Sequence, residues 1–239
     1  MDLVARHHPT DILMVHPKLM EGERMSYGSD SIEEEELKIL VDGERERVRV
    51  FRQRGEASGG HRVEFLLLSH PWFEQRTRQS IYPNPMSRRA VLKFFSLWNQ
   101  AVGALITHHR PDIFHCPDFH SAIAPWYALP SCPHLRILLV LHNAEYQGAI
   151  STDMIRGRVA LHSLAQIFNL TPELVRNHLV QEGRFNMLKA ALDFAVERQG
   201  SRGICAVSRH YASEIRAAHS LLWRAPTVHG LENPMLEEE

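Results

Sequence analysis

The chain has 239 residues, of which 44% are hydrophobic and 23% are charged, and its formal net charge is −1. This length suffices for one large domain or two small ones with a sizeable core, and the near-neutral charge argues against a nucleic-acid surface, which needs a basic excess. Three cysteines without paired spacing favour a reducing compartment over a disulfide framework. We see no secretory signal after Met1 and no apolar run of about 18 residues that would span a membrane. The sequence therefore predicts a cytoplasmic globular protein without a nucleic-acid partner.

Apolar and alternating runs predict strands in the first part of the chain. The run that ends at His16-Pro17 predicts a buried parallel strand, and Asp42-Gly43 between two further runs predicts a hairpin whose loop is longer than two residues. The polar stretch from Lys18 to Glu36 predicts a solvated loop, with an acidic interaction patch as the alternative. The predicted strands are residues 11–15, 37–41, 47–52 and 62–69.

Helical periodicity dominates the rest of the chain. In residues 87–109 the apolar side chains recur at the i, i+3, i+4, i+7 spacing, and we interpret Phe94, Phe95 and Trp98 on this face as core rather than as an aromatic ligand site. Strands at residues 113–114, 136–141 and 204–207 alternate with helices that start at about residue 120 and that cover residues 156–168, 172–181, 185–198 and 208–218. This alternation predicts an α/β fold, with a parallel sheet and helices on both of its faces.

Polar side chains gather where two of the predicted strands end. The first of these polar tips begins at His115 and runs to about His120, and the second follows the strand that ends at Leu141 and runs to Gly148. Ligands of open α/β sheets bind outside the carboxyl ends of the strands, and a set of hydrogen-bonding side chains there suits the hydroxyl groups of a sugar. The alternative is that these side chains only satisfy the loop backbone. The set comprises Asp118, His120, His142, Asn143, Glu145, Tyr146 and Gln147.

Other chemistries find less support in the same tips. Histidine and cysteine can hold zinc, but the sequence has no C-x-x-C or H-x-x-x-H pair, so we predict no metal site. Cys116 lies beside two histidines, yet Pro117 removes a backbone N–H that an oxyanion hole could use, and we predict a buried thiol. A G-x-S-x-G elbow, a P-loop and a G-x-G-x-x-G fingerprint are all missing. The sequence therefore predicts no bound cofactor.

Three motifs resemble those of glycogen and starch synthases. H-C-P-D-F-H-S-A-I-A-P-W-Y-A-L resembles their H-x-x-D-[WY]-H-x-x-x-A-P motif, and L-H-N-A-E-Y-Q-G resembles their T-I-H-N-x-x-Y-Q-G segment. F-N-M-L-K-A-A-L-D-F-A followed by A-V-S-R-H-Y-A-S-E-I resembles their F-x-K-x-G-x-x-x-A and V-S-x-x-Y-A-x-E-I. The closer resemblance is to the synthase domain of fungal-type cell wall α-1,3-glucan synthases, through H-N-A-E-Y-Q-G, Y-P-N-P-M…S-L-W-N-Q, I-F-N-L-T-P-E-L-V, E-G-R-F-N-M-L and L-L-W-R…L-E-N-P.

The resemblance implies a fold and an activity. Such enzymes are GT-B glycosyltransferases, in which two Rossmann-like domains face each other across a cleft and glucose passes with retention from UDP-glucose or ADP-glucose to an α-glucan. It implies that residues 1–239 are the N-terminal, acceptor-side domain, truncated at both ends. The K-x-G-G-L-G loop and the C-terminal nucleotide-sugar domain then lie outside the sequence, so we expect the chain alone to be inactive. Its implied partners are the α-glucan, the nucleotide-glucose and that C-terminal domain. Its implied place is the cytoplasm, or the cytoplasmic face of a membrane through other parts of a larger protein.

The resemblance also assigns roles within the tips. His120 matches the active-site histidine that contacts the donor glucose, and His115 and Asp118 match the shell around it. Pro117 and Ser121 depart from the motif, because a polar residue and a glycine are common there. Two alternatives to the enzyme stay open, namely a non-catalytic glucan- or partner-binding remnant and a metal-dependent hydrolase that uses His115, His120 and His142. The residues matching the second loop of the cleft are His142, Asn143, Tyr146 and Gln147.

Overall fold

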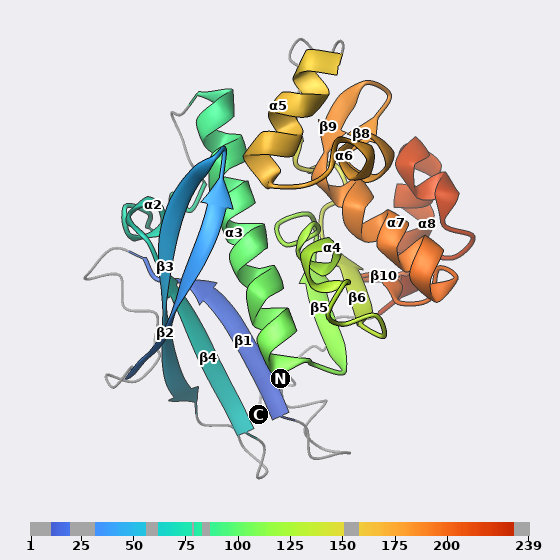
Figure 1. Ribbon diagram of the computed structural model, residues 1–239. Coiled ribbons are helices and arrows are strands. Elements are labelled where there is room, and N and C mark those ends of the chain that lie inside the picture. Colours follow the sequence, from blue (N-terminus) through green and yellow to red (C-terminus); the bar gives the residue numbers. More distant parts are fainter. Residues whose placement is uncertain are drawn as a thin grey trace. The chain divides into compact units, whose positions relative to one another are not determined.

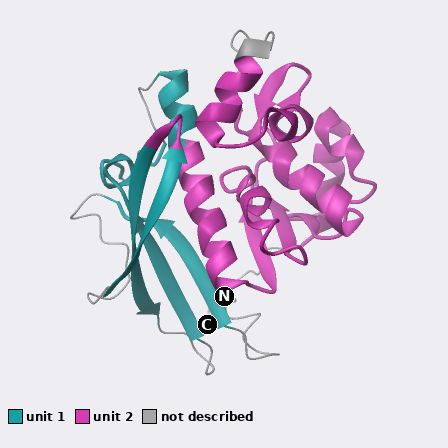
Figure 2. Cartoon of the chain, viewed as in Figure 1, with its two compact units in different colours: residues 1–40, 45–94 teal, residues 41–44, 95–239 magenta. Residues whose placement is uncertain are grey.

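The chain divides into two compact units, each with its own sheet (Figure 2). Unit 1 comprises residues 1–40 and 45–94, and unit 2 comprises residues 41–44 and 95–239. Both sheets contain parallel strands, and helices pack on them, so the predicted α/β class is confirmed. The computed structural model describes residues 11–19, 32–55, 62–77, 79–82, 87–150 and 158–231.

Unit 1 is built on a four-stranded mixed sheet with the order β1-β4-β3-β2 (Figure 1). β1 runs parallel to β4, and β4 runs antiparallel to β3. Val48, Val50, Leu66 and Leu68 are fully buried and alternate along their strands, as a half-buried sheet requires. The strands are β1 (Asp11–Pro17), β2 (Ile32–Val41), β3 (Glu44–Gly55) and β4 (Arg62–Ser69).

The prediction of a polar loop up to Glu36 was wrong, because β2 begins at Ile32. Its glutamates lie opposite the arginines of β3, and Glu34 forms an ion pair with Arg52. Cross-strand pairs of opposite charge stabilise an edge strand that its composition alone does not favour. The turn of this hairpin has only two residues, Asp42 and Gly43, whose φ angles of 56° and 79° are those of a type I′ turn. The predicted longer loop was therefore wrong as well.

Two helices lie between β4 and the next strand in the described residues. The short α2 (Pro71–Glu74) was not predicted, and the imidazole of His70 caps it by accepting from the Trp72 N–H. α3 (Arg88–His109) agrees with the predicted residues 87–109. By length and composition α3 could cross a membrane, but 67% of its most apolar stretch is buried inside the protein. Burial of this kind is typical of a core helix, as the aromatic periodicity predicted.

Unit 2 is built on a four-stranded parallel sheet with the order β11-β10-β6-β5 (Figure 1). α7 (Met187–Gln199) packs on β6, and α8 (Arg209–Ala218) packs on β10 and β11. β6 and β10 are largely buried, which explains why residues 136–141 read as an unbroken apolar run, whereas β5 and β11 are more exposed. The strands are β5 (Ile113–Pro117), β6 (Arg136–Leu141), β10 (Ile204–Ala206) and β11 (His229–Gly230).

Three helices of unit 2 begin at polar N-cap residues. Thr171 accepts from the Leu174 N–H at the start of α6 (Pro172–His178), Asn186 caps α7, and Ser208 caps α8. The sequence missed a small sheet with the order β7-β9-β8, which interrupts the predicted helices between residues 178 and 187. The remaining elements are α4 (Ala124–Ala128), α5 (Arg158–Phe168), β7 (Ala149–Ile150), β8 (Val180–Gln181), β9 (Arg184–Asn186) and the 3-10 helix η3 (Ser220–Arg224).

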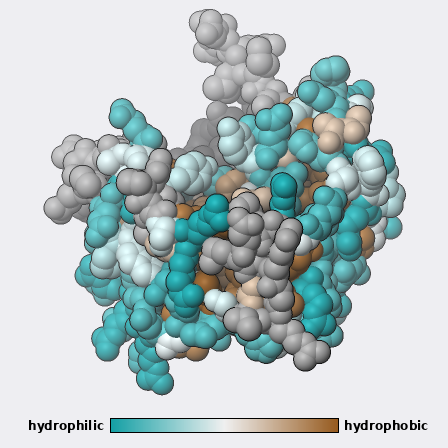
Figure 3. All heavy atoms as spheres, turned by 90° about the horizontal axis from the view of Figure 1, so that it is seen from above, coloured by the Kyte–Doolittle hydropathy of each residue, from teal (hydrophilic) through white to brown (hydrophobic). Residues whose placement is uncertain are grey.

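The described surface is mainly hydrophilic on the face shown in Figure 3, where smaller hydrophobic areas show between polar residues. Among the described residues, large apolar or aromatic side chains with more than half of their surface exposed are few: Ile32, Tyr82, Ile113, Tyr146 and Trp223. Scattered residues of this kind are ordinary on a protein surface. Tyr146 is the one that belongs to a predicted ligand tip.

Candidate functional site

The first tip follows β5 directly. The predicted helix at His120 was wrong, because Asp118 to Ile123 form successive turns and α4 begins only at Ala124. Pro125 lies in the first turn of α4, where a missing N–H costs nothing. The turns place the ring of His120 flat against that of Phe119, with 4.1 Å between the ring centroids. The sequence predicted the polar tip but not its backbone.

Asp118 joins the two tips. Its backbone has a φ of 50°, a left-handed conformation that aspartate tolerates better than most residues. Its Oδ1 accepts hydrogen bonds from the backbone N–H groups of His142 (2.8 Å) and Asn143 (3.1 Å), and its Oδ2 lies 3.4 Å from Nδ1 of the His142 ring. One carboxylate thus fixes the start of the second tip relative to the first.

Residues on α3 hold the first tip from the other side. Asn99 is fully buried, and its Oδ1 accepts from the backbone N–H groups of Ile123 (2.9 Å) and Ala124 (3.1 Å). Its Nδ2 donates to the carbonyl of His120 at 3.0 Å. Trp98 donates from Nε1 to Oγ of Ser121 at 3.0 Å. Sequence reasoning missed Asn99, although a buried amide on an apolar helix face is a signal that such a role exists.

The second tip is held by the remaining motifs. Tyr211 lies at the start of α8, and its hydroxyl accepts a hydrogen bond from the Ala144 N–H at 2.8 Å. Gly148 has a φ of 61°, and a Cβ there would come within 2.5 Å of both Phe119 and Met187. Only glycine therefore fits at this position. The tip is packed against the first tip and against α7 at the same time.

The side chains of Gln147 and Asn143 form hydrogen bonds that stabilise the second tip. Oε1 of Gln147 accepts from Nδ2 of Asn186 at 2.7 Å, and its Nε2 donates to the carbonyl of Ala144. Oδ1 of Asn143 accepts from the Glu145 N–H at 3.2 Å. These contacts favour the alternative in which amide side chains satisfy the loop backbone. Tyr146 differs, because 67% of it is exposed.

Three histidines of the tips lie close enough to influence one another. Burial lowers the pKa of His120 below its usual value, and His142 lowers it further, although a hydrogen bond to the Pro117 carbonyl and the charge of Asp118 act in the opposite direction. Desolvation and His142 also lower the pKa of His115. His120 and His115 are therefore mainly neutral at pH 7, and a neutral imidazole can both donate and accept a hydrogen bond.

Cys116 is a buried thiol, as predicted. It has no exposed surface, and burial together with the nearby Asp118 raises its pKa to about 12. Because the thiolate is the nucleophilic form, this cysteine is inert at neutral pH.

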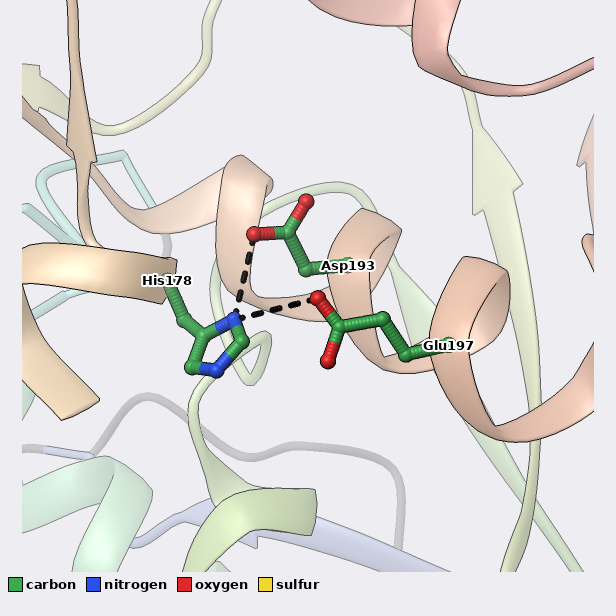
Figure 4. A group of neighbouring side chains, drawn as sticks. All are labelled: His178, Asp193 and Glu197. Carbon is green, nitrogen blue, oxygen red and sulfur yellow. Dashed lines mark hydrogen bonds and ion pairs between the residues drawn. The ribbon is translucent and has the colours of Figure 1, made fainter.

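A metal centre formed by the tip histidines finds no support in the structure. Within the described part of the chain, only His178, Asp193 and Glu197 have potential ligand atoms that all lie within 4.8 Å of one another (Figure 4). Asp193 is fully buried and already accepts from Lys189, while Nε of Arg224 lies 3.0 Å from its Oδ1. Two cations around one carboxylate indicate a structural charge cluster rather than a cation site.

The structure therefore brings four of the predicted site residues together, and the other three lie outside this cluster. His115, Asp118, His120 and His142 cluster at the ends of β5 and β6. Asn143 and Gln147 stabilise the second tip, and Tyr146 projects its surface to solvent. Their roles toward a substrate stay predictions. Asn99 and Tyr211 join them as residues that position the tips.

A parallel sheet has polar tips at its carboxyl edge, and residues from separate motifs tie these tips together. The sequence pattern of the starch synthase catalytic domain matches residues 2–230. The chain belongs to this family. The predicted family and its GT-B fold are thus confirmed.

The relatives are fungal and bacterial glucan synthases. The cell wall alpha-1,3-glucan synthase mok13 of Schizosaccharomyces pombe is 27% identical over 228 residues, which are 95% of this chain and 9% of that protein. The cell wall alpha-1,3-glucan synthase ags1 of the same organism is 29% identical over 172 residues, 72% of this chain and 7% of the relative. A glycogen synthase of Koribacter versatilis is 30% identical over 187 residues, 72% of this chain and 35% of the relative. The chain thus spans under a tenth of the fungal relatives and about a third of the bacterial one.

Proposed function

We propose that the chain supplies the acceptor-side half of a retaining glucosyltransferase, which adds glucose from UDP-glucose or ADP-glucose to an α-glucan of the α-1,3-glucan type. The half-site lies at the ends of β5 and β6. The donor-side residues come from a C-terminal nucleotide-sugar domain, and the reaction takes place in the cytoplasm or at the cytoplasmic face of a membrane.

The observation that supports this proposal best is the network that links the family motifs. Asp118 of the first motif binds the backbone of His142 and Asn143 in the second. Tyr211 of the third motif binds the same loop, and Asn186 binds its Gln147. Residues up to 93 positions apart in the chain thus converge on two short loops. A catalytic site needs such support, because its groups must be held in a fixed geometry.

In this proposal His120 contacts the sugar. Its ring is held by stacking on Phe119 and by the hydrogen bond to the Pro117 carbonyl, which selects one ring orientation. A neutral imidazole in that position can donate to a glucose hydroxyl. It can also stabilise charge that develops on the sugar when the bond to the leaving group breaks. Tyr146 adds an exposed ring that can cover the apolar face of a pyranose.

Binding of glucan oligosaccharides tests the proposal. Nigero-oligosaccharides and malto-oligosaccharides are titrated by calorimetry against the protein and against His120→Ala. The matched control is His134→Ala, since His134 is an exposed histidine just before the start of β6, at the end of the strand away from the tips. We expect His120→Ala to weaken binding by about tenfold, the effect of one lost hydrogen bond to a buried partner, and His134→Ala to leave it unchanged. Equal affinities for all three proteins would remove His120 from the site.

Transfer is tested separately from binding. The chain is mixed with radiolabelled UDP-glucose or ADP-glucose and an oligosaccharide acceptor, with and without the C-terminal domain of an α-1,3-glucan synthase. Product that forms only with both parts present supports the half-site. Oligosaccharide binding without any product in the reconstituted mixture supports the alternative of a non-catalytic glucan-binding remnant.

A further inference from the structure

A groove outside the histidine cluster lies between α8 and the edge strand β11, both in unit 2. It has a volume of about 620 Å³, within the range of small-molecule sites. Arg209, Ala212, Ser213 and Arg216 line it from α8, at the i, i+3, i+4, i+7 positions that share one helix face. His229 and Gly230 line it from β11.

The geometry of the groove depends on Gly230. A Cβ on this residue would lie 2.4 Å from both the N and the Cα of Arg209, so β11 runs directly against the first residue of α8. The floor is apolar, because Ala212 and Val228 are buried. The rim is polar and exposed. The groove is thus a fixed feature of two packed elements.

Among the residues that the structure describes, neither guanidinium group in the groove has an acidic partner. In the part of the chain that the structure describes, Arg52 pairs with Glu34 and Glu64, and Arg224 pairs with Asp193. No described carboxylate lies within 4.0 Å of Arg209 or Arg216. The chain as a whole has a net charge of −1. The groove therefore carries two guanidinium charges that no described carboxylate neutralises.

The chemistry of the lining selects the class of ligand. The side chains offer guanidinium, imidazole and hydroxyl donors, and no carboxylate or amide acceptor. The two guanidinium groups only donate, and a phosphate group, which consists of acceptors, matches their planar fork better than an uncharged sugar does. The net charge of −1 over the whole chain argues against a nucleic acid as the ligand.

We propose that the groove between α8 and β11 binds a phosphate-bearing small molecule, with Arg209 and Arg216 as its charged contacts. The lining of the groove shares no residue with the histidine cluster, and its ligand need not be the sugar donor. The proposal stands independently of the proposed function.

The test uses inorganic pyrophosphate as the probe, with glucose 1-phosphate, ADP and maltotriose as further arms. Binding is measured by calorimetry, and the backbone amide signals of Ser213 and Gly230 are followed by NMR. We expect saturable pyrophosphate binding that shifts both amides. Arg209→Ala and Arg216→Ala should each weaken it about tenfold or more, since a hydrogen bond to a charged group is lost. Arg216→Lys should recover part of the affinity because it keeps the charge without the fork.

Two controls locate the binding. Arg198→Ala removes an exposed helix arginine outside the groove and should leave the affinity unchanged, and so should His120→Ala. An equal loss in Arg198→Ala would reduce the effect to non-specific charge attraction. Absence of saturable binding at millimolar pyrophosphate, or a response to maltotriose alone, would overturn the proposal. The arm that binds most tightly shows whether the phosphate belongs to a sugar or to a nucleotide.

Discussion

The clamp formed by Asp118 makes a prediction about stability that separates its hydrogen bonds from its backbone conformation. Asp118→Gly removes two hydrogen bonds to the backbone of His142 and Asn143, at about 1 kcal/mol each, but tolerates the φ of 50°. The expected loss is about 2 kcal/mol of unfolding free energy. Asp118→Ala loses the same bonds and adds about 1 kcal/mol for alanine in a left-handed conformation. Asp118→Asn keeps an acceptor and tolerates this φ, so it should cost under about 1 kcal/mol.

Urea denaturation of the three variants, followed by tryptophan fluorescence, gives the order of their stabilities. Hydrogen exchange at the amides of His142 and Asn143 reports the clamp directly, and their protection should fall in the glycine and alanine variants. An alanine variant that is no less stable than the glycine variant would refute the argument from φ. Unchanged protection of both amides would refute the clamp.

Three further results follow from the titratable groups of unit 2. In a urea titration, Asp193→Ala should lower the unfolding free energy by about 3–5 kcal/mol, because it leaves the cations around a buried site without a counter-charge. Glu197→Gln, at the exposed edge of the same cluster, should change the unfolding free energy by under about 0.5 kcal/mol. Cys116 should resist iodoacetamide at pH 8 until urea unfolds the protein, since its pKa is raised to about 12; labelling of the native protein would contradict this. The ring signals of His120 and His115 should titrate below pH 6.5. The unfolding free energy should therefore fall as the pH drops through 6.5, because the unfolded chain binds more protons there than the folded protein. A stability that rises on acidification would contradict the lowered pKa values.

Local sequence signals predicted those parts of the fold that local physics decides. The cap residues Thr171 and Ser208 start helices because their side chains satisfy nearby N–H groups, and the Asp-Gly pair forms a turn because both residues tolerate positive φ. The tip after residue 141 was predicted because the buried strand β6 is an unbroken apolar run, and the tip after residue 117 because polar residues follow the short apolar pair Ile113-Phe114. The family was predicted from motif order, and the match over residues 2–230 confirms it.

The errors arose where distant partners decide the structure. The glutamates before Leu37 look like a solvated loop until the arginines of β3 lie opposite them. Asn99 binds groups 21 to 25 positions away, which no helical periodicity can reveal. Gln147 has the chemistry of a sugar ligand, yet Asn186 engages its carbonyl oxygen. Residue type predicted where polar groups gather, and only the three-dimensional contacts show which of them are already engaged.

The most direct test of the half-site follows the histidine ring signals while a nigero-oligosaccharide is added. We expect the signals of His120 and His142 to shift together with a single affinity, and Asp118→Ala to weaken the response of both. His134, which precedes the opposite end of β6, should not respond. Shifts confined to histidines outside the two tips, or an undiminished response in Asp118→Ala, would contradict the claim that these loops form one glucan-facing site.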